Sequence, residues 1–178
     1  MRGYFGIGVE GLSKAMNAGN LFRTAHAFGA SFVFTINARY SVKSGKSDTS
    51  RTPLHVPWHS HDTVADMVLP EGCELVGIEF LDEAAELPSF HHPAQAAYVL
   101  GPERGSLSPE LLARCQHLVR IPTRFCVNLG TAGAIVMYDR MLTHGRFAER
   151  PISSLAQPAP RQAHIHGGPR MRRRGELP

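Results

Sequence analysis

The sequence contains little cysteine and no long apolar run. Its three cysteines, Cys73, Cys115 and Cys126, are far apart and form no CxxC pair. A disulfide framework and a zinc ribbon both need paired cysteines, so we expect neither, and a reducing cytoplasm is the default compartment. No apolar segment reaches the roughly 18 residues that span a bilayer. Residues 1–14 lack the charged start, apolar core and small-residue cleavage site of a secretory signal, so we expect no membrane association.

The chain also lacks a charge excess outside its last residues. The formal net charge of all 178 residues is +4, and residues 161–178 alone hold five arginines against one glutamate. Residues 1–160 are therefore neutral overall, and binding of an acidic partner such as RNA needs local basic patches or this segment. From residue 149 the sequence is rich in Pro, Gly and Arg without apolar periodicity. This pattern predicts one domain at 1–148 followed by a disordered tail at 149–178.

Common nucleotide and metal signatures are missing. Neither GxGxxG nor GxxxxGK[ST] follows the first apolar run, which argues against a Rossmann or P-loop enzyme. The histidines at 55, 59, 61, 91 and 92 have no HExxH or comparable ligand spacing, so we expect no metal.

Short apolar runs alternate with segments of helical periodicity. Uninterrupted apolar strands such as Ser31–Ile36 are typical of a sheet that is covered on both faces. The sequence therefore predicts an α/β fold with a mostly parallel sheet and helices on both faces. The expected strands are 4–9, 31–36, 54–58, 74–80, 97–100 and 117–121, and the expected helices are 17–28, 63–68, 109–114 and 131–143.

Unusual polar segments lie at the expected carboxyl ends of strands, where parallel sheets bind ligands. In NAGNLFR, Asn17 is suited to cap a helix and Arg23 to hold a phosphate or carboxylate. The plain alternative is a capped surface helix with a solvated arginine. In LGPERGSL, Glu103 projects from a strand-end turn, although Gly and Pro there are also ordinary turn residues.

A third segment, IPTRFCVNLGTAG at 121–133, joins an expected strand to the last expected helix. Asn128 lies there among small residues whose exposed backbone groups suit an adenine or ribose edge. The alternative is a simple helix N-cap at Asn128 or Thr131.

In this order, the three segments resemble the motifs of the SpoU (TrmH-like) branch of the SPOUT methyltransferases. Those motifs are Asn-x-Gly with an arginine six residues after the asparagine, then Gly-x-Glu at a strand end with Gly-Leu shortly after. The third is Ile-Pro, then Ser-Leu-Asn and small residues that open a helix ending in an acidic pair with Tyr. The resemblance covers about residues 3–145, and its matching residues are Asn17, Gly19, Arg23, Gly101, Glu103, Leu107, Ile121, Pro122, Asn128, Ala132, Tyr138 and Asp139.

The chain departs from these motifs at a few positions. Ser-Leu-Asn is Cys126-Val-Asn here, which replaces a hydroxyl by a thiol, a poorer hydrogen-bond donor. Gly105 stands one place early, and Ser106 stands where glycine is usual. Only Thr123–Phe125 separate Ile-Pro from Cys126.

The resemblance implies a cytoplasmic enzyme that uses S-adenosyl-L-methionine (AdoMet) to methylate ribose 2′-hydroxyls of RNA, with tRNA favoured over rRNA. It also implies a trefoil knot in the C-terminal half and a homodimer in which Arg23 approaches the partner's cofactor. The implied catalytic residues are Arg23, Asn17, Glu103 and Asn128, and the implied cofactor contacts are Leu100, Gly101, Ile121, Cys126, Leu129 and Ala132.

The basic segments are the expected RNA contacts. Arg39, Lys43, Lys46 and Arg51 lie in a turn-rich segment that either binds RNA phosphates or is a solvated loop. The arginine-rich tail either adds salt-sensitive attraction to RNA or is inert. The alternative function is a non-catalytic RNA-binding or assembly protein on the same fold, with Cys126 marking a decayed site.

Overall fold

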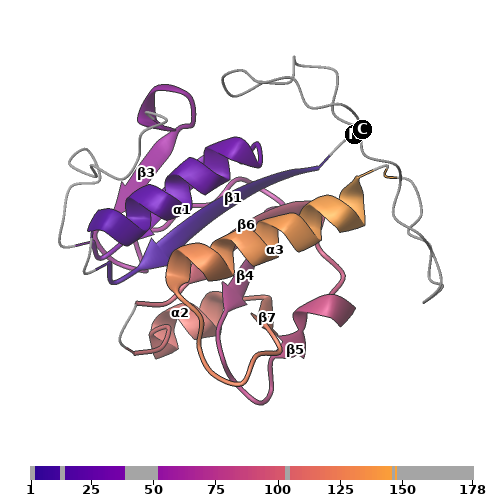
Figure 1. Cartoon of the computed structure of the whole chain (residues 1–178). Coiled ribbons are helices and arrows are strands. Elements are labelled where there is room, and N and C mark those ends of the chain that lie inside the picture. Colours follow the sequence, from indigo (N-terminus) through magenta and orange to yellow (C-terminus); the bar gives the residue numbers. More distant parts are fainter. Residues whose placement is uncertain (1–2, 13–14, 39–51, 103–104, 146, 148–178) are drawn as a thin grey trace, which may run out of the picture. The chain divides into compact units, whose positions relative to one another are not determined.

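A parallel sheet forms the centre of the structure, a computed structural model that describes residues 3–12, 15–38, 52–102, 105–145 and 147 (Figure 1). Within these residues seven strands pair in the order β3-β2-β1-β6-β4-β7-β5, and every ladder is parallel. The strands are β1 (Tyr4–Glu10), β2 (Phe32–Ile36), β3 (Trp58–His61), β4 (Glu74–Ile78), β5 (Ala85–Glu86), β6 (Gln95–Leu100) and β7 (His117–Arg120).

Helices cover both faces of this sheet. Figure 1 shows α1 (Ala15–Ala27) and α3 (Leu129–His144) across the same face, while α2 (Pro109–Arg114) belongs to the other. Alternate residues of each strand enter the two cores, as a doubly covered sheet requires. One core includes Ile7, Val9, Leu21, Phe22, Val136 and Met137, and the other includes Phe32, Phe34, Ile36, Met67, Leu107 and Leu111.

The strand register aligns the carboxyl ends of the central strands. Val9 of β1 and Ile78 of β4 are both paired with Leu100, the last residue of β6. The segments that leave these strands therefore start side by side at one edge of the sheet, where ligands bind in open parallel sheets.

The predicted fold class is confirmed, and most predicted elements occur. Met1–Thr143 form one compact unit, and His144–Pro178 fall outside it, with only residues 144, 145 and 147 of that segment described. The expected knot and the boundary at 148 stay predictions. No helix of the described segments is long and apolar enough to cross a membrane.

Two predicted elements are wrong. The strand expected at 54–58 is instead β3 at Trp58–His61, preceded by a 3-10 turn at Thr52–Leu54. Pro57 has no N–H to donate, so the ladder starts after it, although its carbonyl accepts from Val33 N–H at 2.8 Å. The helix expected at 63–68 is a turn. The side chain of Asp66 accepts hydrogen bonds from the hydroxyl and N–H of Thr63, and such local bonds compete with a helix.

Other differences concern helix ends and short elements. Asn17 is the third residue of α1 and not its cap, because Ala15 and Met16, both good helix formers, already belong to the helix. Helix α3 starts at Leu129, two residues earlier than expected. The two-residue β5 and the 3-10 turn at Leu87–Ser89 are too short to give a periodic signal.

A buried arginine fastens α3 to the sheet. Arg140 is 5% exposed and donates from Nη2 to the carbonyls of Tyr4 (3.1 Å) and Ala94 (2.9 Å). Its Nη1 donates to the carbonyl of Pro93 (2.6 Å) and the hydroxyl of Tyr98 (3.1 Å). These acceptors lie at the starts of β1 and β6 or inside β6, so one guanidinium binds the amino ends of two strands to the last helix.

The hydroxyl of Tyr98 continues this network. Burial raises the pKa of Tyr98 to about 12, so the phenol keeps its proton at neutral pH. The hydroxyl lies 2.6 Å from Nδ1 of His92, and Nε2 of His92 lies 3.0 Å from a carboxylate oxygen of Asp139. Asp139 belongs to α3, which gives that helix a second polar connection to the strand.

Replacing Arg140, which anchors α3 to the sheet, should destabilise the fold. Arg140→Met keeps most of the aliphatic length but leaves the three carbonyls without their donor, and we expect a loss of about 3 kcal/mol in the free energy of unfolding. Urea denaturation followed by circular dichroism measures it. Arg124→Met, at an exposed position, is the matched control and should change stability by less than about 0.5 kcal/mol. Equal stability of the two variants would contradict the anchoring role of Arg140.

Candidate functional site

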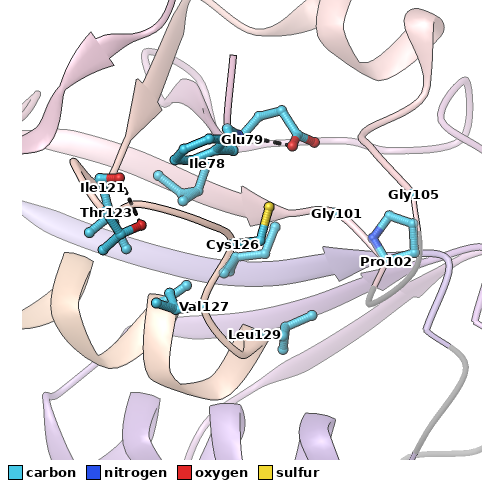
Figure 2. A pocket seen from close by; sticks show the side chains of 13 residues that line it. Ile78, Glu79, Gly101, Pro102, Gly105, Ile121, Thr123, Cys126, Val127 and Leu129 are labelled. Atoms are coloured by element: carbon cyan, nitrogen blue, oxygen red, sulfur yellow. Dashed lines mark hydrogen bonds between the residues drawn. The ribbon is translucent and has the colours of Figure 1, made fainter. Parts of the chain in front are cut away.

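A cavity of about 240 Å³ opens at the carboxyl ends of β4, β6 and β7 (Figure 2). Ile78 and Leu100, the last residues of two neighbouring strands, form its floor together with Ile121, which follows β7. The segment after β6 and the segment that leads into α3 form its walls. Parallel strands thus bring together residues that are more than 40 positions apart in the sequence.

All the residues predicted as cofactor contacts line this cavity. They come from the end of β6, the segment between β7 and α3, and the first turn of α3, and they are Leu100, Gly101, Ile121, Cys126, Leu129 and Ala132. Their common location is observed, whereas their contact with a cofactor stays a prediction.

The segment after β6 is held against the strand ends by two carboxylates. Glu79, directly after β4, accepts a hydrogen bond from Leu107 N–H at 2.8 Å. Glu10, the last residue of β1, accepts from Ser108 N–H at 2.7 Å and from its hydroxyl at 2.5 Å. Ser108 in turn caps α2 by accepting from Leu111 N–H at 3.2 Å. Both carboxylates therefore hold the end of this wall that leads into α2, while its other end continues directly from β6.

Glycine is favoured at two points of this wall. A Cβ at Gly101 would lie 3.1 Å from the backbone nitrogen of Leu107 and 3.3 Å from a carboxylate oxygen of Glu79. Gly105 has a φ of +128°, a conformation that side chains other than hydrogen strongly disfavour. These positions explain why the segment is rich in glycine independently of any ligand.

Glu79 and Glu10 were missed by the sequence analysis. Each is the first carboxylate at the carboxyl end of a buried apolar strand, in the runs ELVGIEF and YFGIGVE. A charged residue that ends an uninterrupted apolar strand was therefore a usable signal, because the edge of a parallel sheet needs acceptors for the N–H groups of the loops that cross it.

Asn128 acts as the N-cap of α3. Its side-chain oxygen accepts from Gly130 N–H at 2.9 Å, and its carbonyl accepts from Ala132 N–H at 2.8 Å. Asn128 is exposed and is not among the described residues that line the cavity. The helix cap, which was the alternative to a ligand contact at Asn128, is therefore what the structure shows.

The glycines of the same segment serve helix packing. A Cβ at Gly133 would overlap Cδ1 of Leu21 in α1, and one at Gly130 would lie 3.4 Å from Cβ of Asn20. These positions let α1 and α3 approach closely, and neither lines the cavity. The small-residue cluster thus has two roles, with Cys126, Val127, Leu129 and Ala132 facing the cavity and the glycines facing α1.

Of the other predicted catalytic residues, Arg23 and Asn17 are described, and neither is among the residues that line the cavity. Arg23 is exposed on α1, and Asn17 is half-buried near the start of that helix. Glu103 and the predicted RNA contacts Arg39, Lys43, Lys46 and Arg51 lie outside the described residues.

The histidines do not gather at one place. His55 stacks on His26 with ring centroids 4.8 Å apart. His59 and His61 lie on β3 beside Phe32 and line a separate, mostly apolar cavity of about 330 Å³. Burial and the neighbouring His59 lower the pKa of His61. In the described part of the chain, no three His, Cys, Asp or Glu side chains form a group suited to a metal ion.

Residues 5–138, about three quarters of the sequence, match the model of the SpoU rRNA methylase family. The chain belongs to this family. A search among curated proteins gives no match.

Solved structures of SpoU-type enzymes have the same fold. An rRNA methyltransferase from Sinorhizobium meliloti is 19% identical with a TM-score of 0.71, over 80% of this chain and 58% of that one. The SpoU methyltransferase AviRb from Streptomyces viridochromogenes, in complex with AdoMet, is 20% identical with a TM-score of 0.70, over 82% and 60%. This chain thus spans less than two thirds of either protein.

A third structure concerns 2-OH methylation of C/U34 on tRNA. It is 26% identical to this chain with a TM-score of 0.68, and the match covers 79% of this chain and 91% of that one. This chain therefore matches nearly the whole length of that structure.

Two substitutions at Asn128 distinguish its role as a helix cap from a direct contact with a ligand. Asn128→Ala should lower the free energy of unfolding by about 1 kcal/mol, whereas Asn128→Asp keeps the capping oxygen and should retain wild-type stability. Urea denaturation tests this difference. If Asn128 acts only as a cap, Asn128→Asp also keeps wild-type affinity for AdoMet in calorimetry. A folded Asp variant that has lost AdoMet affinity would show that the amide contacts the ligand.

Proposed function

We propose that this protein is an AdoMet-dependent RNA methyltransferase that modifies ribose 2′-hydroxyls. The observation that carries the proposal is the convergence of all six predicted cofactor residues on one cavity in a chain of the SpoU methylase family. Family members use AdoMet, and two of the similar solved structures contain it.

The cavity wall fits such a cofactor. Leu100, Ile121 and Leu129 supply apolar surface for a flat adenine ring, as small-molecule sites commonly do. Gly101 exposes its backbone at the wall, where main-chain groups can pair with the ring edge. Leu100, Ile121 and Leu129 also belong to one hydrophobic core. Because that core holds them in place, the site is preformed.

Bound AdoMet supplies a methyl group that is already electrophilic because it is attached to a sulfonium. The remaining task is to orient a ribose 2′-hydroxyl and remove its proton. The methyl–sulfur bond breaks as the methyl–oxygen bond forms, the sulfur keeps the electron pair, and the hydroxyl proton passes to a base. The products are a 2′-O-methylated ribose and S-adenosylhomocysteine (AdoHcy).

Arg23 is the residue proposed to act at the hydroxyl. It is exposed on α1 and lies outside the described cavity lining, so we assign it to the cavity of a partner subunit in a homodimer. A guanidinium cannot accept a proton. Arg23 therefore holds the ribose and its phosphate, and the phosphate oxygen beside it takes the proton.

Transfer RNA is the favoured substrate. The similar structure concerned with tRNA has the highest identity of the three described, and this chain spans nearly its whole length. The sequence segment between β2 and β3 carries Arg39, Lys43, Lys46 and Arg51, which we assign to RNA phosphates. The alternative function is that of a non-catalytic protein, which would bind RNA without transferring methyl groups to it.

The enzyme should bind AdoMet in calorimetry and transfer labelled methyl groups from it to bulk tRNA. Arg23→Ala should reduce methyl transfer on the order of 100-fold or more and change AdoMet affinity by less than about twofold, because Arg23 contacts the reacting ribose only. Mapping the 2′-O-methyl sites lost in a strain without the protein identifies the nucleotide. Binding of AdoMet and RNA without transfer would favour the non-catalytic alternative.

Mixed dimers test whether Arg23 acts across subunits. Gly101→Val adds a branched side chain at the cavity wall, where even a Cβ would lie 3.1 Å from the backbone nitrogen of Leu107, and should block the cavity of its own subunit. A dimer of one Arg23→Ala and one Gly101→Val subunit combines an intact cavity with an intact arginine from the partner. It should therefore recover activity that neither homodimer has, and an inactive mixed dimer would assign Arg23 to its own subunit.

A further inference from the structure

Glu79 places a carboxylate in the cavity wall. It follows the last residue of β4, and Figure 2 shows its side chain between the end of that strand and the segment that holds Gly101 and Gly105. Among the described residues that line the cavity, it is the only one with a carboxylate or a basic group. The side chain is half-buried, so its charge is only partly screened by water.

The hydrogen bonds that Glu79 accepts come from the backbone. One carboxylate oxygen accepts from Leu107 N–H at 2.8 Å and the other from Phe80 N–H at 2.9 Å. No described Lys, Arg or His lies within 4 Å of it. Its hydrogen bonds to described residues come from neutral backbone groups, and Glu79 is the one charged side chain among the described residues of the cavity lining.

We propose that Glu79 makes the site prefer the methyl donor over the spent product. The inference rests on the proposed function. AdoMet carries a positive charge on its sulfonium, and the transfer of the methyl group leaves a neutral thioether in AdoHcy. The two molecules share the same adenosine, ammonium and carboxylate groups. A carboxylate in the wall attracts the additional charge of the donor and has no equivalent partner in the product.

This preference opposes product inhibition. Donor and product compete for one cavity and bury nearly the same apolar surface, so shape distinguishes them poorly. A fixed charge acts on the one feature that changes during the reaction. It therefore favours release of AdoHcy and entry of a new AdoMet after each turnover.

Glu79 also has a structural role, which the test must separate from its charge. Its hydrogen bond to Leu107 N–H holds the segment after β6 in place. Glu79→Gln keeps an oxygen that can accept this bond and removes the charge. Glu79→Asp keeps the charge on a shorter side chain, and Glu79→Ala removes both.

The experiment measures the dissociation constants of AdoMet and AdoHcy for the full chain by calorimetry and uses their ratio. Glu79→Gln should weaken AdoMet binding about three- to tenfold and change AdoHcy binding by less than twofold. The ratio cancels any change in cavity shape that affects both ligands equally. Glu71→Gln, which makes the same charge change at an exposed turn before β4, should leave the ratio unchanged.

The outcomes are distinct. An equal loss of affinity for both ligands in Glu79→Gln and Glu79→Ala would overturn the inference and leave Glu79 as a positioning residue alone. If the Gln variant does not fold, the Ala variant provides the neutral comparison, and Glu79→Asp should keep a ratio near the wild-type value. A wild-type protein that binds neither ligand would refute the proposed function itself, which is a separate result.

Discussion

The position of α3 on the sheet is the constraint on which the site depends. The buried guanidinium of Arg140 fixes the carboxyl-terminal half of the helix to the starts of β1 and β6, and Gly133 lets the amino-terminal half pack against Leu21 of α1. With both ends held, the first turn of α3 can lie only beside the strand ends. Leu129 and Ala132 therefore close a cavity that the sheet alone would leave open.

A second set of polar contacts shapes the opposite wall. Strand-end carboxylates accept hydrogen bonds from the backbone N–H groups of Leu107 and Ser108 and so hold the end of the segment after β6 beside β4 and β1. The same carboxylates are costly to bury and are tolerated because each accepts such bonds. Glu79 thus combines two properties, since the group that orders the wall also gives the cavity its charge.

Periodicity was sufficient to predict the central strands and the helices α1, α2 and α3, because buried parallel strands are uninterrupted apolar runs such as Ser31–Ile36. The common location of the six residues implied as cofactor contacts was also predictable, since strand ends converge whatever the details of the loops. Asn128 and the glycines were harder, because the same small polar residues suit a ligand, a helix cap and a close helix crossing. The hydrogen bonds by which Arg140 anchors α3 were not predictable at all. Arg140 and Tyr4 are 136 residues apart, and nothing local to either indicates that they meet.

The three thiols of the molecule differ in a way that has a practical consequence. Burial raises the pKa of Cys73, and it raises that of Cys115 to about 11, so both stay protonated at neutral pH. Cys126 is exposed at the mouth of the cavity. Mild alkylating reagents will therefore modify Cys126 first, and a ligand in the cavity will slow that reaction because it covers the thiol.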